Sequence, residues 1–213
     1  MTAGNLLRLG LLGLLLALVL QPNWFTPLFA PLAPAGGPVI YARSSLLSLS
    51  LSHLGLVALA SVAATLVAVT LAIFVTRPVG ASFLPLSRTI TNIGQTFPPV
   101  AVLALAVPSL GFGSGPTLVA LFLYGLLPIF ENAITALSTL PPATMEAARG
   151  MGLNRWQRLW RVELPLALPV ILTGIRLSVV IALGTATIGS TVAARTLGEV
   201  IIAGLLTNNT AYV

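Results

Sequence analysis

The chain has 213 residues, of which 57% are hydrophobic and only 7% are charged. A soluble domain carries about a quarter of its residues as charged side chains, so this composition excludes an ordinary water-soluble globule and indicates a protein embedded in lipid. All ten cations are arginine and all four acids are glutamate, and the sequence contains no lysine, aspartate or cysteine.

The missing residue types exclude several kinds of site. A phosphate-binding P-loop needs the lysine of its GK[ST] element, so this chain cannot itself be a Walker-type ATPase. Because cysteine is absent and His53 is the single histidine, we expect no metal site. The pI near 11.4 would suggest nucleic acid for a soluble protein. Arginines that hold cytoplasmic loops at an anionic membrane explain it better here, so no nucleic-acid partner is expected.

Runs of ~20 apolar residues bounded by charge or by Pro and Gly predict membrane-spanning helices. The first run, Leu6–Leu20, is either a retained helix or a signal-peptide core, and a Pro-rich external loop follows it to residue 45. We therefore divide the chain into residues 1–45 and a helical core, residues 46–213. The spans expected in this core are Leu54–Thr76, Leu86–Val107 with a break at Pro98-Pro99, Pro116–Leu137 and Leu166–Val192.

A shorter amphipathic segment, Arg195–Leu206, follows the last span. Within it Thr196 and Glu199 have the T-x-x-E spacing of a helix-opening capping box. The prediction is an all-α membrane protein, a polytopic helical bundle with about five transmembrane helices.

The arginines predict the orientation. With a cytoplasmic N-terminus, only Arg43 and Arg195 lie outside, and the inner segments hold Arg8, Arg77, Arg88, Arg149, Arg155, Arg158 and Arg161. Because positive residues accumulate on the cytoplasmic side, this orientation is favoured over its reverse. The long connection of residues 138–165 is then cytoplasmic.

This connection reads as two short helices with a break between them. Pro141 and Pro142 favour the start of the first helix, and Gly150 and Gly152 favour its end. Asn154, with Gln157 three residues later, has the spacing of a capping box for the second helix. These residue properties leave open whether the connection is only a loop on the membrane surface. In that case its tryptophan rings would point into the membrane and its arginines toward the lipid phosphates.

The spacing within the connection is more specific. Glu146-Ala147-Ala148, three residues, Gly152, nine residues, Val162, one residue and Leu164-Pro165 resembles the EAA motif of bacterial ABC-importer permeases. The resemblance implies that the helix from Glu146 to Gly152 is a coupling helix, which docks in a groove of a separate ATPase. On that interpretation Ala147 and Ala148 allow close approach, Glu146 offers a charged contact and Gly152 makes the turn. The chain would then be a permease and not an enzyme, and ATP and Mg²⁺ would bind only to the partner.

Longer runs resemble the permeases of osmoprotectant importers, namely Val162-Glu-Leu-Pro-Leu-Ala-Leu-Pro, Gly174-Ile-Arg and Gln95-Thr-Phe-Pro-Pro. The resemblance implies a type I, MetI-like permease of the bacterial plasma membrane that carries glycine betaine, choline, carnitine or proline. It also implies two ATPase subunits, a second copy or a homologous permease, and an external substrate-binding protein. Such permeases continue into one more transmembrane helix, so a last helix is expected to be missing here.

Polar groups at membrane depth are candidates for function. Glu131 and Arg176 lie at similar depth in neighbouring spans and are expected either to form an ion pair or to reach the headgroups separately. Asn92, Gln95, Thr96 and Phe97 precede the Pro98-Pro99 break, where irregular backbone suits a translocation pathway, with helix–helix hydrogen bonding as the alternative.

Other functions compete with the importer of compatible solutes. The chain could be the permease of an importer for another small solute, such as an amino acid. An intramembrane hydrolase would need a nucleophile and a base, and the sequence has no G-x-S-x-G element. An ion channel or membrane scaffold fits the hydropathy but leaves the EAA spacing unexplained.

Overall fold

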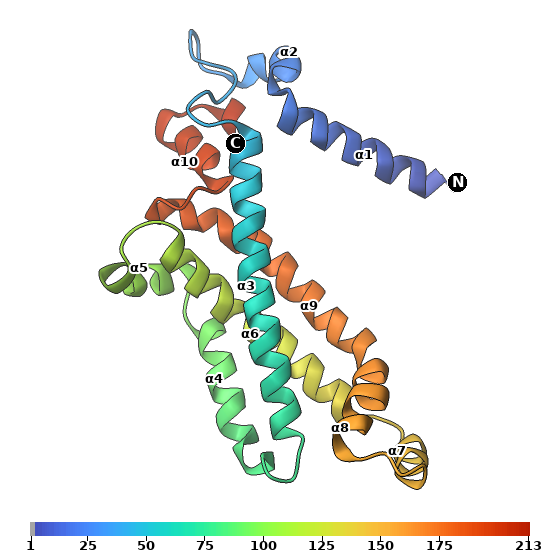
Figure 1. Cartoon of the computed structure of the whole chain (residues 1–213). Coiled ribbons are helices and arrows are strands. Elements are labelled where there is room, and N and C mark those ends of the chain that lie inside the picture. The colour runs from blue at the N-terminus through green and yellow to red at the C-terminus, as the bar shows by residue number, and fades with distance from the viewer. Residues whose placement is uncertain (1–2) are drawn as a thin grey trace.

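A computed structural model describes residues 3–213 and contains helices and no strand over that range (Figure 1). This confirms the predicted all-α class. The α-helices are α1 (Ala3–Leu20), α2 (Thr26–Phe29), α3 (Leu46–Val75), α4 (Leu84–Thr96), α5 (Pro99–Leu110), α6 (Ser114–Ser138), α7 (Pro142–Gly150), α8 (Arg155–Arg158), α9 (Leu164–Ala186) and α10 (Gly198–Thr207).

Helices α3, α6 and α9 pack side by side and form the centre of the bundle. Small residues allow this close packing, since a Cβ added to Gly125 of α6 would lie 2.7 Å from the Ser178 Oγ of α9 and 3.2 Å from the Ala64 Cβ of α3. Phe130 and Ile129 fill the space further along α6 and are fully buried. Close approach through small residues is the usual way in which apolar helices associate in lipid, where the hydrophobic effect does not drive them together.

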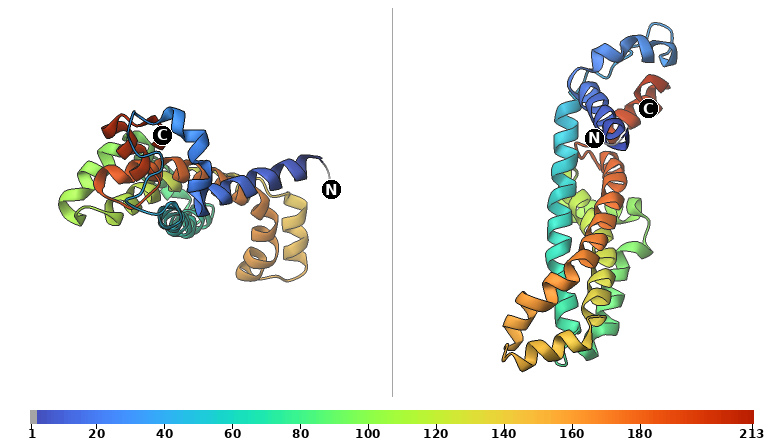
Figure 2. Two further views of the ribbon diagram at one scale, coloured as in Figure 1. Left: turned by 90° about the horizontal axis from the view of Figure 1, so that it is seen from above. Right: turned by 90° about the vertical axis from the view of Figure 1, so that its right-hand side faces the viewer.

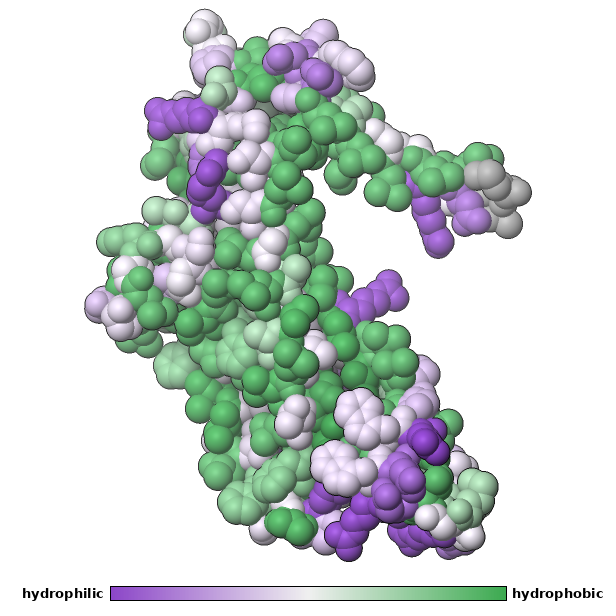
Figure 3. Space-filling model, viewed as in Figure 1, coloured by the Kyte–Doolittle hydropathy of each residue, from purple (hydrophilic) through white to green (hydrophobic). Residues whose placement is uncertain are grey.

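By length and composition, three helical stretches can cross a membrane, namely Leu46–Val75, Ser114–Ser138 and Arg155–Val192, the last of which contains α9. Two bent helix pairs bring the total to five if each pair is one span. Apolar side chains cover the middle of the molecule, and hydrophilic ones gather toward its two ends (Figure 3). The predicted spans at α3, α6 and α9 are therefore confirmed.

The expected span Leu86–Val107 is not straight. Helices α4 and α5 are bent by 97° at Phe97–Pro98. Pro98 lacks an N–H group and forces the residue before it out of the helical conformation, and Phe97 is accordingly extended (φ −97°, ψ 142°). As a result α5 leaves the direction of α4 and points toward one side of the bundle, beside the start of α6 (Figure 1).

Helix α1 projects away from the bundle and meets α3 only near its own C-terminal end (Figures 1 and 2). Residues 4–16 are all exposed, including Leu11 and Leu15 at more than half of their surface. The chain bends by 108° after Leu20, and α3 begins behind Ser45, whose Oγ accepts a hydrogen bond from the Ser48 N–H at 3.2 Å.

At the end of the bundle opposite α7 and α8, α10 packs against the loop that precedes α3 (Figure 1). The Tyr41 and Ser44 hydroxyls donate hydrogen bonds of 2.8 and 2.9 Å to Oε1 of Glu199. Burial raises the pKa of the Tyr41 phenol, and the hydrogen bond to Glu199 raises it further. The predicted capping box is wrong, because Glu199 binds this loop and the Thr196 Oγ1 lies 2.7 Å from the Ser190 Oγ.

Residues after α10 hold the same loop. Asn209 donates from Nδ2 to the Pro38 carbonyl at 2.8 Å, and the Thr210 hydroxyl donates to the Leu32 carbonyl at 2.6 Å. The Tyr212 ring packs edge-on against Tyr41. These contacts join segments that lie far apart in the sequence.

His53 has a structural position in α3. Its ring is buried, with Nε2 3.1 Å from the Leu183 carbonyl, and its Nδ1 accepts from the Leu197 N–H at 3.4 Å. This pattern assigns the ring proton to Nε2. His53 thus joins α3 to the end of α9 and the start of α10.

Candidate coupling segment and translocation surface

The connection between α6 and α9 forms the two predicted helices. Pro142 opens α7, and Gly152 follows its end with a φ of +77°, a left-handed conformation that glycine adopts readily. The Gly152 N–H and Leu153 N–H bond back to the Arg149 and Ala148 carbonyls, at 2.9 and 3.2 Å. The predicted helix break is therefore confirmed.

The second helix begins with the predicted capping box. The Asn154 side chain accepts from the Gln157 N–H, and the Gln157 side chain accepts from the Asn154 N–H, both at 2.9 Å. Trp156 and Trp160 follow on one face and are 71% and 65% exposed. Two wide, accessible aromatic side chains therefore lie at the end of the bundle that carries α7 and α8.

The motif residues of α7 divide between the surface and the interior. Glu146 and Ala147 are exposed, whereas Ala148 is only 1% exposed. The expectation that both alanines lie on a docking face is wrong for Ala148, because consecutive helical residues point in directions about 100° apart. Glu146 and Ala147 remain available to a partner.

The second half of the motif surrounds a buried acid, Glu163, which is not among the predicted site residues. A π-helical turn, η4 (Leu159–Glu163), leads into α9, and Val162, Leu164 and Pro165 flank Glu163 on both sides. The Glu163 side chain is 3% exposed. Arg77 Nη2 donates to its Oε2 at 2.5 Å, and Arg158 Nε donates to its Oε1 at 2.9 Å.

Close to the bend between α4 and α5, α6 holds the end of α4. The Tyr124 hydroxyl of α6 donates to the Phe97 carbonyl, and Gln95 Nε2 of α4 donates to the Tyr124 carbonyl at 3.3 Å. A Cβ added to Gly94 would lie 2.3 Å from the Leu123 carbonyl oxygen, so only glycine permits this approach of α4 to α6. Hydrogen bonds between helices therefore fix the bend.

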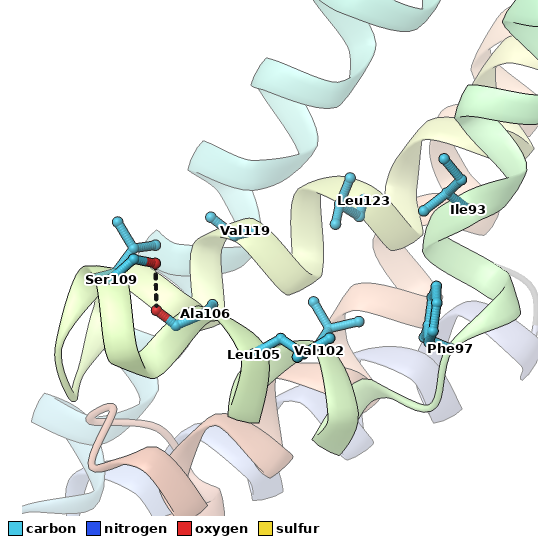
Figure 4. Close-up of a pocket in the computed structure, with 9 residues that line it drawn as sticks. Ile93, Phe97, Val102, Leu105, Ala106, Ser109, Val119 and Leu123 are labelled. Atoms are coloured by element: carbon cyan, nitrogen blue, oxygen red, sulfur yellow. Dashed lines mark hydrogen bonds between the residues drawn. The ribbon is translucent and has the colours of Figure 1, made fainter.

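An apolar pocket of about 390 Å³ lies inside this bend (Figure 4). Its lining includes Ile93 and Phe97 from α4, Val102 and Leu105 from α5, and Leu123 from α6. In Figure 4 these side chains converge from the three helices. Of the four predicted pathway residues, only Phe97 lines this pocket.

The predicted Glu131–Arg176 ion pair is wrong. Glu131 instead accepts from Arg88 of α4, with Nε–Oε1 and Nη2–Oε2 distances of 3.0 and 3.2 Å. Arg176 is exposed on α9 and forms no ion pair within residues 3–213. Similar depth in the membrane did not identify the partner, because the rotation of each helix decides which side chains face each other.

The Arg88–Glu131 pair belongs to an exposed polar strip on α4 and α6. We use the name polar strip for the following residues: Arg88, Thr89, Asn92, Gln95 and Thr96 on α4, and Glu131, Thr135 and Ser138 on α6. The α4 members recur at helical spacing and are all exposed, and the α6 members are exposed or half-buried. In a molecule covered with apolar side chains at mid-height (Figure 3), such a strip is poorly suited to contact with lipid.

Two features that the sequence reasoning missed had signals in the sequence. Glu163 is the one acid between the last fixed positions of the motif, directly before a span. Arg88 is four residues before Asn92 on the polar face of α4, and its spacing from Asn92 and Gln95 already places the three on one side of a helix.

These features together define a class. Apolar helices, small-residue packing and a kinked connection at one end are the features of a polytopic helical membrane protein.

The chain matches the model of the family described as "Binding-protein-dependent transport system inner membrane component" over residues 68–213, and it belongs to this family. Its fold is that of a solved structure of the MetNI methionine ABC transporter, with a TM-score of 0.66 and 22% identity, covering 79% of this chain and 82% of that one. The predicted MetI-like fold is thereby confirmed.

Characterised relatives include the osmoprotectant import permease protein OsmY of Salmonella typhimurium, which is 43% identical over 77% of this chain and 70% of that protein. The glycine betaine/carnitine/choline transport system permease protein OpuCB of Bacillus subtilis is 37% identical over 66% of this chain and 68% of that protein. The carnitine transport permease protein OpuCD of Listeria monocytogenes is 44% identical, and the match spans 58% of this chain and just over half, 56%, of that protein. The predicted resemblance to osmoprotectant permeases is confirmed at the level of sequence.

Proposed function

We propose that the chain is the translocation subunit of an ATP-driven importer for compatible solutes, such as glycine betaine, choline, carnitine or proline. The observation that carries this proposal is the identity of 37–44% to permeases named for osmoprotectants, carnitine and choline. An external binding protein would deliver the solute. Two ATPase subunits, which would hold the ATP and Mg²⁺, would drive the pathway between inward-open and outward-open states.

Helix α7 is the proposed docking element for the ATPase. It lies at one end of the bundle, ends at a fixed turn, and presents Glu146 and Ala147 on its surface. A small residue at the contact lets the helix approach a groove closely, and a carboxylate offers a charged contact.

Co-purification tests this docking. Ala147→Trp should abolish association with the ATPase subunit encoded with this permease. Ala81→Trp, at another exposed alanine in the turn between α3 and α4, should leave association unchanged. Undiminished association of the Ala147 variant would contradict docking through α7.

The polar strip is the proposed wall of the translocation pathway. A second permease, identical or homologous, would cover it, so that Asn92, Gln95 and Thr96 face a hydrated space and not lipid. Asn92→Leu should then lower uptake, while Leu66→Asn on the exposed apolar face of α3 serves as a matched change of polarity outside the strip.

Uptake assays distinguish the substrate classes. Cells that carry the complete transporter should accumulate labelled glycine betaine, choline, carnitine or proline in a manner that depends on this chain. Accumulation of a labelled amino acid such as methionine with none of these four would favour the alternative of an importer for another small solute.

The proposed orientation places the N-terminus and α7 in the cytoplasm, because the arginines near α7 and α8 outnumber those at the opposite end. The chain has no cysteine, so single cysteines can be introduced without background. A cysteine at exposed Met151 should resist membrane-impermeant maleimide in intact cells, and one at exposed Arg43 should react. The reverse pattern would overturn the orientation.

A further inference from the structure

Glu163 connects three segments of the chain. Arg77 lies two residues after the end of α3, Arg158 closes α8, and Glu163 is the last residue of η4, directly before α9. Each carboxylate oxygen accepts from a different arginine. We call this group the Glu163 clamp.

The clamp is buried at its centre. The Glu163 side chain is 3% exposed and that of Arg158 is 15% exposed, while Arg77 keeps 31% of its side-chain surface accessible. Leu159, on the same π-helical turn, is also buried. A carboxylate is costly to bury, and two arginines offset this cost only when their geometry is fixed, so the burial of Glu163 ties the three side chains to one arrangement.

The local backbone supports a role beyond packing. Five residues from Leu159 to Glu163 form a π-helical turn between α8 and α9, and π-helical turns are rare and frequent at functional sites. Here the turn joins the segment that carries the EAA motif to the span α9. Its last residue points at the end of α3, a helix that packs against both α6 and α9.

We infer that Glu163 is a positioning residue. It transmits movement of the coupling segment, which consists of α7 and α8, to α3 as well as to α9. The chain itself links α7 to α6 and α8 to α9, and the clamp adds a side-chain link from α8 to the end of α3. With this link, a displacement of α8 pulls on Arg77 through a charge-assisted hydrogen bond. This inference rests on the proposed docking of α7 to an ATPase.

The test uses the complete transporter reconstituted in proteoliposomes, with uptake and ATP hydrolysis measured together. Glu163→Gln should keep the ATPase subunits bound and should raise the number of ATP molecules hydrolysed per solute transported by about fivefold or more, the lower end of ordinary coupling between sites. Arg161→Gln, an exposed arginine on the same turn, is the matched control and should leave this ratio unchanged.

Arg77→Lys, which keeps a cation beside Glu163, should retain the wild-type ratio, whereas Arg77→Gln should raise it, and a role in packing alone does not predict this difference. If Glu163→Gln does not assemble, the ratio is measured in Arg77→Gln instead. This variant removes the link to α3, while Glu163 keeps Arg158 as its partner. An unchanged ratio in an assembled variant overturns the inference. Loss of ATPase binding by Ala147→Trp is independent of this result, so failure of the proposed docking is distinguished from failure of the clamp.

Discussion

Two glutamates of this chain form ion pairs with arginines from other segments, and their surroundings differ. Glu163 is buried and has two arginines, whereas Glu131 and its single partner Arg88 keep 37% and 51% of their side-chain surface exposed. The buried group joins α8 and the start of α9 to the end of α3, and the exposed pair is part of the polar strip. We therefore expect changes at the clamp to lower stability, and changes at the strip to lower transport at nearly constant stability.

The largest loss of stability is expected for Glu163→Ala. The change leaves Arg77 and Arg158 facing each other without a counter-charge. The expected cost is about 3 kcal/mol, the lower end for breaking a buried ion pair, because Arg77 retains access to solvent. Thermal unfolding in detergent measures it. Glu146→Ala removes an exposed glutamate from the same connection and should change stability by less than about 0.5 kcal/mol. Equal melting temperatures for the two variants would contradict the expected difference.

A smaller effect is expected for Gly152→Ala, at the break between α7 and α8. No atom lies within 4 Å of the added Cβ, so the cost comes from the backbone, at about 1–2 kcal/mol for a left-handed residue. Gly150→Ala is the control, because Gly150 is helical and its Cβ is also unobstructed. That variant should be neutral or slightly stabilising, so a matching loss there would show that the turn does not carry the effect.

Tyr124→Phe tests the bend near the polar strip. It removes the hydrogen bond to the Phe97 carbonyl and should cost about 1 kcal/mol. The melting temperature and the rate of solute uptake are measured together. Tyr212→Phe keeps the ring that packs on Tyr41 and serves as the control. If Tyr124→Phe matches wild type in both measurements, the hydrogen bond does not hold the bend.

The smallest change in stability, below about 1 kcal/mol, is expected for Arg88→Gln and Glu131→Gln, because their ion pair is exposed. Uptake should nevertheless fall in both variants if the strip lines the pathway. The exchange Arg88→Glu with Glu131→Arg should recover part of the uptake, and an exchange of Glu131 with Arg176 should recover none. Recovery by the second exchange would favour the pairing that the structure does not show.

Local signals predicted the connection between α6 and α9 well. Prolines, glycines and an Asn-x-x-Gln spacing act through the backbone within a few residues, so they indicated where α7 ends and α8 begins. Long apolar runs likewise predicted α3, α6 and α9, because the thickness of the bilayer determines the required length.

The same local signals did not predict which side chains of different helices contact each other. Helix α9 is apolar on nearly all sides, so its sequence does not indicate the rotation that leaves Arg176 facing away from Glu131. The direction of α5 was also not predictable, since a proline pair indicates a break but not an angle of 97°. Thr196 and Glu199 have the spacing of a capping box, but a distant tyrosine and serine bind the glutamate instead.

The contacts of Asn209 and Thr210 with the loop before α3 have a consequence for biosynthesis. Asn209 is translated 171 residues after Pro38, and Thr210 is translated 178 residues after Leu32. At ordinary elongation rates the loop waits roughly 10 to 30 s for these partners. Residues 32–41 therefore acquire these contacts only after α9 and α10 have been synthesised, and translation that stops before Asn209 would leave this loop without them.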